Sequence, residues 1–99
     1  MPAIPATALD DVARRFSLLG NPTRLRILGA LYDGGQGTVG EIAAAAQVSV
    51  ANASQHLGRL AMGGMVGRRQ EGRTVVYQIT EPVIEQLCAL MCSTVGARR

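Results

Sequence analysis

The chain is 99 residues long, which leaves room for one small hydrophobic core and excludes an ordinary two-domain enzyme. Apolar residues make up 47% and charged residues 17%, the balance of a globular domain, and one Phe and two Tyr leave the core mainly to aliphatic side chains. The net charge of +3 is locally concentrated, since positions 59–73 hold four arginines and one acid. A local basic region permits nucleic acid as a partner.

Residues 1–6 contain two prolines and show no periodicity, so we expect a flexible N-terminal arm followed by one domain over residues 7–96. No apolar segment reaches the ~20 residues that cross a bilayer, and the N-terminus has no basic region followed by a long apolar run. We therefore expect a cytoplasmic protein without a membrane partner.

Apolar residues recur at helical spacing in the first third of the chain. They predict a helix with Thr7 as its N-cap and Gly20 as its stop. Asn21 then caps a second predicted helix, which has Pro22 at its first position, where proline costs no hydrogen bond. Glycines at positions 34 and 35 end this helix.

Two short helices follow, predicted over residues 39–46 and 50–62. The junction is Gln47-Val48-Ser49, in which Ser49 is a favourable N-cap for the second helix. Two short helices with such a connection are typical of a helix-turn-helix motif.

A hairpin is predicted directly after the 50–62 helix. Its strands are residues 65–69 and 74–79, and residues 70–73 form the turn between them. A helix-turn-helix followed by a basic hairpin predicts a winged helix-turn-helix fold, mainly α, with five helices and a two-stranded wing.

The last helix is predicted to follow Thr80 as its N-cap, with Glu81 and Pro82 in its first turn. Its apolar residues cover more than one side, which one small domain cannot bury alone. One stripe contains Ile84, Leu87, Cys88, Met91 and Val95. A second apolar flank contains Val83 and Leu90. We therefore expect a homodimer built from the first and last helices.

Small and amide side chains occupy the outward side of the predicted 50–62 helix, when residues are placed about 100° apart. Asn52 and Gln55 can each form two hydrogen bonds with adenine, and Ala51 can touch a thymine methyl group. Arg59 can reach a guanine or a phosphate. The hairpin arginines are expected along the DNA backbone or in the minor groove; they are Arg68, Arg69 and Arg73.

Two simpler interpretations compete with this one. Any soluble helix has a polar side, but the order of capped helix, second helix, glycine stop and basic hairpin is a stricter pattern than any of its parts. His56, the single histidine, is more often a structural hydrogen-bonding group or a phosphate contact than a metal ligand, because a zinc site usually needs three or four ligands.

Three segments together resemble the ArsR/SmtB family of small bacterial winged-helix repressors: "LGNPTRLRIL", "VSVANASQHLGRL" and "GMVGRRQEGRTVVYQI". They occur in the family's order and spacing over about residues 10–95. The resemblance implies a homodimeric repressor that binds an inverted repeat in double-stranded DNA and leaves it when an inducer acts. It places Ser49, Asn52, Ser54, Gln55 and His56 on the recognition helix and Arg68, Arg69, Gly72 and Arg73 on the wing.

The sequence does not identify the inducer. Residues 39–43 lack the cysteine pair of the metal sensors in this family, and no histidine follows His56. Cys88 and Cys92 share a side of the last helix, a spacing that does not suit a disulfide within it. They can start a soft-metal site, act as a thiol redox switch, or serve as small core residues. No cofactor is required, and regulation without an inducer is a further alternative.

Other functional classes fit less well. A G-x-G-x-x-G match at residues 35–40 lacks the preceding strand and the later acid of a dinucleotide-binding enzyme. His56 has no acid within a dozen residues to form a hydrolytic triad. We therefore expect no enzymatic activity. The remaining alternative is a winged-helix protein-interaction module without inducer sensing.

Overall fold

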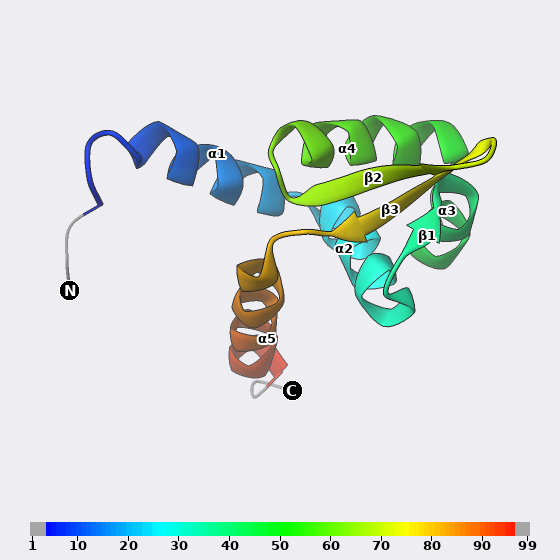
Figure 1. The fold of residues 1–99 in the computed structure, drawn as a ribbon. Coiled ribbons are helices and arrows are strands. Elements are labelled where there is room, and N and C mark those ends of the chain that lie inside the picture. Colours follow the sequence, from blue (N-terminus) through cyan, green and yellow to red (C-terminus); the bar gives the residue numbers. More distant parts are fainter. Residues whose placement is uncertain (1–3, 97–99) are drawn as a thin grey trace.

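A computed structural model describes residues 4–96 as five helices and a small antiparallel sheet (Figure 1). This confirms the mainly α winged helix-turn-helix fold. The elements in chain order are α1 (Leu9–Leu19), α2 (Pro22–Gly34), β1 (Gly37–Thr38), α3 (Val39–Ala46), α4 (Val50–Met62), β2 (Val66–Glu71), β3 (Thr74–Ile79) and α5 (Pro82–Gly96).

The sheet has three strands in the order β1-β3-β2, one more than the sequence predicted. The added strand β1 pairs with β3 through Gly37 and Thr38, which lie opposite Tyr77 and Val76. Two residues are too few to show the alternation that identifies a strand in sequence. The pairing ties the start of α3 to the base of the wing.

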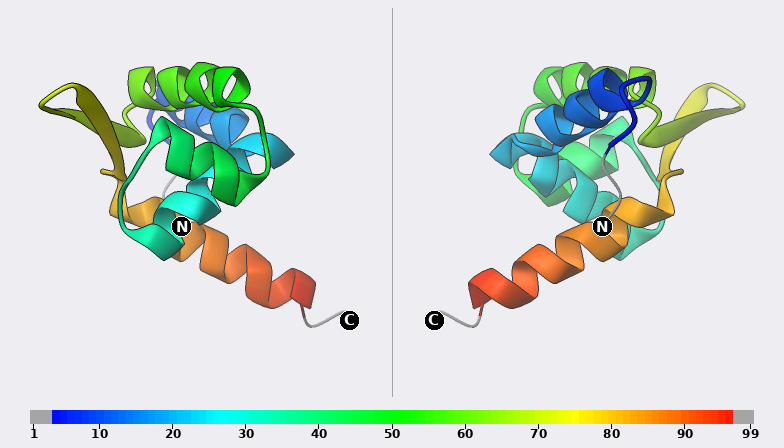
Figure 2. Two further views of the ribbon diagram at one scale, coloured as in Figure 1. Left: turned by 90° about the vertical axis from the view of Figure 1, so that its right-hand side faces the viewer. Right: turned by 90° about the vertical axis from the view of Figure 1, so that its left-hand side faces the viewer.

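The wing is a tighter hairpin than expected. Strand β2 continues to Glu71, which lies opposite Thr74, so the predicted turn at residues 70–73 reduces to Gly72-Arg73. Of these two residues only Gly72 has a positive φ, 62°, as a type II′ turn requires at its first central position. The hairpin tip therefore projects well beyond the helices (Figure 2).

Side-chain caps set three of the helix starts. Asn21 Oδ1 accepts from the Arg24 N–H at 3.1 Å, and Ser49 Oγ accepts from the Asn52 N–H at 3.0 Å, which confirms both predicted caps. Thr38 and Glu41 form a reciprocal capping box at α3. Because these caps fix α3 and α4, the helix-turn-helix has the boundaries that the sequence predicted.

Two predicted caps are wrong. Helix α1 begins at Leu9 after Ala8, with no side-chain cap, because Thr7 lies in a turn in which the Ala8 N–H donates to the Pro5 carbonyl at 2.9 Å. The Thr80 hydroxyl donates to the Gly64 carbonyl at 3.3 Å, and α5 begins two residues later at Pro82.

The expected N-terminal arm at residues 1–6 lies partly outside the described residues, which begin at position 4, so this boundary stays a prediction. No helix within residues 4–96 is long and apolar enough to span a membrane.

The core lies where α2, α3, α4 and the base of the wing meet. Its largest fully buried side chains are Ile27, Leu28, Leu31, Leu57, Leu60, Met65 and Ile84. Helix α5 contributes one buried residue, Ile84, and then extends away from the other helices (Figures 1 and 2). Cys88 packs against the core and Leu87 is partly buried, whereas Val83, Leu90, Met91 and Val95 are exposed.

Candidate nucleic-acid interface

Helix α4 is held rigidly by its inner side. Ala53, Leu57 and Leu60 are completely buried, as the predicted inner face requires, and Ala61 is partly buried. The side chains that face away from this row therefore have defined positions on the surface, which is what a helix that reads DNA needs.

The predicted base-reading residues lie on the open side of α4. Ala51, Ser54, Gln55 and Arg59 are exposed, and Asn52 is partly exposed. Ser49 serves as the N-cap through its hydroxyl oxygen, so its O–H remains as a donor. The uncovered N-terminal turn also places the positive end of the helix dipole at this surface.

The wing arginines have three different environments. The Arg69 guanidinium donates to Glu71, Gln78 and Gln36 at 2.8–3.3 Å, so it braces the wing against the loop before β1. Arg68 lies over the Tyr77 ring, 6.0 Å from its centroid. Arg73 is exposed at the hairpin tip beside Gly72. Arg69 is therefore engaged within the chain, whereas Arg73 is exposed at the tip.

His56 joins α4 to α2. Its Nδ1 accepts from Arg24 Nε at 3.2 Å, so the ring proton sits on Nε2. Burial and then the charges of Arg24 and Arg59 lower the pKa of His56 below its ordinary value of 6.5. The imidazole is therefore neutral at physiological pH, and its Nε2–H remains available as a donor.

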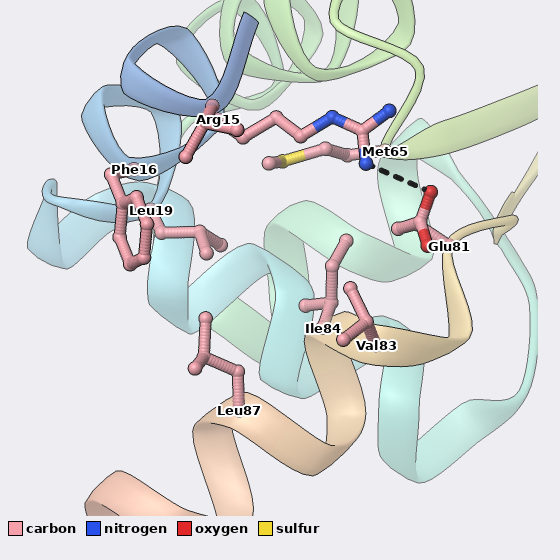
Figure 3. A pocket seen from close by; sticks show the side chains of 9 residues that line it. Arg15, Phe16, Leu19, Met65, Glu81, Val83, Ile84 and Leu87 are labelled. Atoms are coloured by element: carbon pink, nitrogen blue, oxygen red, sulfur yellow. Dashed lines mark hydrogen bonds and ion pairs between the residues drawn. The ribbon is translucent and has the colours of Figure 1, made fainter. Parts of the chain in front are cut away.

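A second surface lies between α1 and the start of α5, shown in Figure 3. Phe16 and Leu19 on α1 face Ile84 and Leu87 on α5 across an apolar cavity of about 200 Å³. The Arg15 guanidinium crosses its rim and donates to Glu81 Oε2 at 3.1 Å. This surface is separate from the open side of α4.

The two cysteines differ in environment. Cys88 is half-buried and packs against the core, and burial, with a smaller contribution from Cys92, raises the pKa of its thiol. Cys92 is exposed. Within residues 4–96 no three metal-binding side chains come together in one chain. A site at these thiols therefore needs the corresponding pair of a second subunit.

Sequence reasoning missed the role of Arg24. It is a buried arginine, 9% exposed, on the inner part of α2. The one available signal was its position in "NPTRLRIL", where a charged residue interrupts an apolar helix face. Its contact with His56, 32 positions away, is not visible in a single sequence.

Comparisons with known proteins agree with the fold. The model of a family described as "Helix-turn-helix domain" matches residues 19–68. The "Probable mercury resistance operon repressor" of Streptomyces lividans is 33% identical over 87 residues, covering 88% of this chain and 69% of that protein. The regulator Rv0324 of Mycobacterium tuberculosis is 38% identical, and the match spans 38% of its length.

Solved structures give the same result. The antimony-specific transcriptional repressor AntR superposes with a TM-score of 0.88 at 28% identity, covering 99% of this chain and 88% of that chain. The homodimeric winged helix-turn-helix DNA-binding domain of Mb0332 from Mycobacterium bovis gives a TM-score of 0.83 at 34% identity, covering 99% and 93%. The chain belongs to the ArsR/SmtB family of winged helix-turn-helix transcriptional regulators.

Proposed function

We propose that the protein is a homodimeric repressor that binds an inverted-repeat operator through α4 and the wing and leaves it when an inducer acts. The observation that carries the proposal is the rigid α4, with buried Ala53, Leu57 and Leu60 on one side and exposed Gln55 and Arg59 on the other. In this arrangement Asn52 and Gln55 read bases, and the wing arginines contact the backbone.

The dimer is proposed to form through α1 and α5. Phe16, Leu90 and Met91 are 58%, 66% and 62% exposed in the isolated chain, although they are large and apolar. A second copy would bury them together with the mouth of the cavity between α1 and α5. The Mb0332 domain, which is described as homodimeric, supports the formation of a dimer.

For the inducer we propose a soft metal ion bound by Cys88 and Cys92 of both subunits. Thiolates prefer such ions, and the related proteins named for mercury and antimony support the choice. The raised pKa of Cys88 disfavours a redox switch, because the reactive thiolate is scarce at neutral pH. A metal ion avoids that difficulty because coordination itself displaces the proton.

Two substitutions test the DNA-binding surface. Arg73→Ala should weaken binding to specific and random duplexes by the same factor, about tenfold, because it removes a backbone contact. Gln55→Ala should weaken binding about tenfold to the operator only, because it removes base contacts. Fluorescence anisotropy at several salt concentrations measures both, with Arg26→Ala as an exposed-arginine control on α2.

Equal losses on specific and random DNA for Gln55→Ala would refute its base-reading role. DNA affinity that does not fall with salt would instead favour a protein-interaction module.

A further inference from the structure

A basic cleft, separate from the wing, lies between α1, the start of α2 and the C-terminal half of α4. It encloses about 500 Å³, and its lining includes Arg14, Arg24 and Arg59. Among its lining residues, Arg24 is buried and Met62 is 92% exposed. No acidic side chain is part of the lining.

Arg24 is a buried cation that lacks a counter-ion. It is 9% exposed and forms no ion pair with a carboxylate among residues 4–96. Its Nε is engaged by the neutral His56 ring, while neither terminal guanidinium nitrogen has a hydrogen-bond acceptor within the described part of the chain. The terminal nitrogens are not among the fully enclosed side-chain atoms, so an anion that enters the cleft can reach them.

Arg59 adds a second charge at the same place. It lies three residues after His56 on α4, so both side chains project from the same side of the helix. The lowered pKa of His56 has the charges of Arg24 and Arg59 among its causes, which places both close to the ring. Arg14 is at the rim in an exposed pair with Asp11 at 3.0 Å, a pair that is weak in water. Arg24 and Arg59 are therefore the anchors.

The position of the cleft relative to α4 indicates which anion it meets. Figure 2 shows the wing on one side of α4 and the start of α2 on the other. A helix in the major groove has a sugar-phosphate backbone on each side, and the wing can serve only one of them. We propose that the cleft binds a backbone phosphate on the other strand, with the terminal nitrogens of Arg24 and the guanidinium of Arg59 as donors.

This proposal rests on the proposed function and extends it. The contact is independent of sequence, so it raises affinity for any duplex and fixes the register of α4 in the groove. The paired guanidinium nitrogens match the oxygens of a phosphate.

The test compares duplexes in which single phosphates are replaced by neutral methylphosphonates. For the wild-type protein, one position on the strand opposite the wing contact should weaken binding roughly tenfold when neutralised. The same replacement should have a smaller effect on Arg24→Gln and on Arg59→Gln than on the wild type, and the plots of log affinity against log salt should be shallower for both variants, by up to about 0.9. Arg26→Gln, an exposed arginine on the same helix as Arg24, is the matched control and should behave as wild type.

Arg59→Gln keeps the test valid if Arg24→Gln fails to fold, because Arg59 is exposed. Salt slopes of both variants equal to the wild-type slope, with no coupled phosphate, would overturn the proposal even if Arg73→Ala weakens binding as expected. A wild-type protein that binds no duplex at all would contradict the proposed DNA-binding function itself. Millimolar inorganic phosphate that perturbs the Arg24 side-chain NMR signal, where operator DNA does not, would assign the cleft to a free anion and also overturn the proposal.

Discussion

His56 shows how one neighbour decides the role of a lone histidine. The sequence predicted a structural hydrogen-bonding group or a phosphate contact, and the bond from Arg24 Nε supports the structural role. Burial of the ring, followed by the charges of Arg24 and Arg59, lowers its pKa and keeps it neutral.

The lowered pKa of His56 predicts a pH dependence of stability. Because the folded protein holds the ring neutral more firmly than the unfolded chain does, this contribution is complete above pH 6.5 and is lost as the pH falls through the folded pKa. The wild-type melting temperature should therefore drop from pH 7 to pH 5 more steeply than that of His56→Gln. NMR titration of the ring should give a pKa below 6.5, and a value above it would contradict the account.

Cap residues were predictable only where no competing contact exists. Asn21 and Ser49 precede helices whose first N–H groups have no other acceptor, so their side chains cap as expected. Thr80 has the same chemistry, but the Gly64 carbonyl lies within reach of its hydroxyl. Such a partner, 16 positions away in the chain, is not visible in the local pattern.

Among the elements, α4 was predicted to the residue because a serine cap, a helical apolar period and a glycine stop all agree. Strand β1 was missed because it consists of two residues and exists only by pairing with β3. Helix α5 lies between these cases. Its apolar stripe could be predicted from the sequence, and the structure shows that Ile84 is its one fully buried residue.

The exposed side of α5 predicts the effect of a charge. Leu90→Glu places a carboxylate on the surface proposed to join two subunits, and burying it there would cost several kcal/mol. The variant should be monomeric by analytical ultracentrifugation at micromolar concentration, with unchanged helix content, whereas the wild type is dimeric. Leu25→Glu, at a 43% exposed position on α2, is the control and should remain dimeric.

A monomeric wild type, or a dimer that survives Leu90→Glu unchanged, would rule out the proposed α1 and α5 interface.

At the scale of the whole molecule, local motifs identified the family, but the arrangement of distant residues was not readable. The motifs are contiguous, so a single sequence displays them. Arg24 and Arg59 are far apart in the chain and become neighbours only when α2 packs against α4. The proposed phosphate cleft and the Arg15–Glu81 pair over the apolar cavity are therefore results of the structure.

The proposed repressor binds operator DNA, and an inducer at the cysteines ends the binding. The most direct measurement is the affinity for a duplex from immediately upstream of its own coding sequence. Separate samples of the protein should be reduced, oxidised with diamide or persulfide, or loaded with Zn(II), Cu(I) or As(III). Each measurement should be repeated with Cys88→Ser.

We predict tight, salt-dependent binding by the reduced protein. A soft metal ion should abolish this binding, and Cys88→Ser should keep it in the presence of the ion. Absence of binding by the reduced protein would contradict the repressor itself. Tight binding unchanged by every treatment would contradict sensing at Cys88 and Cys92 and leave both as structural residues.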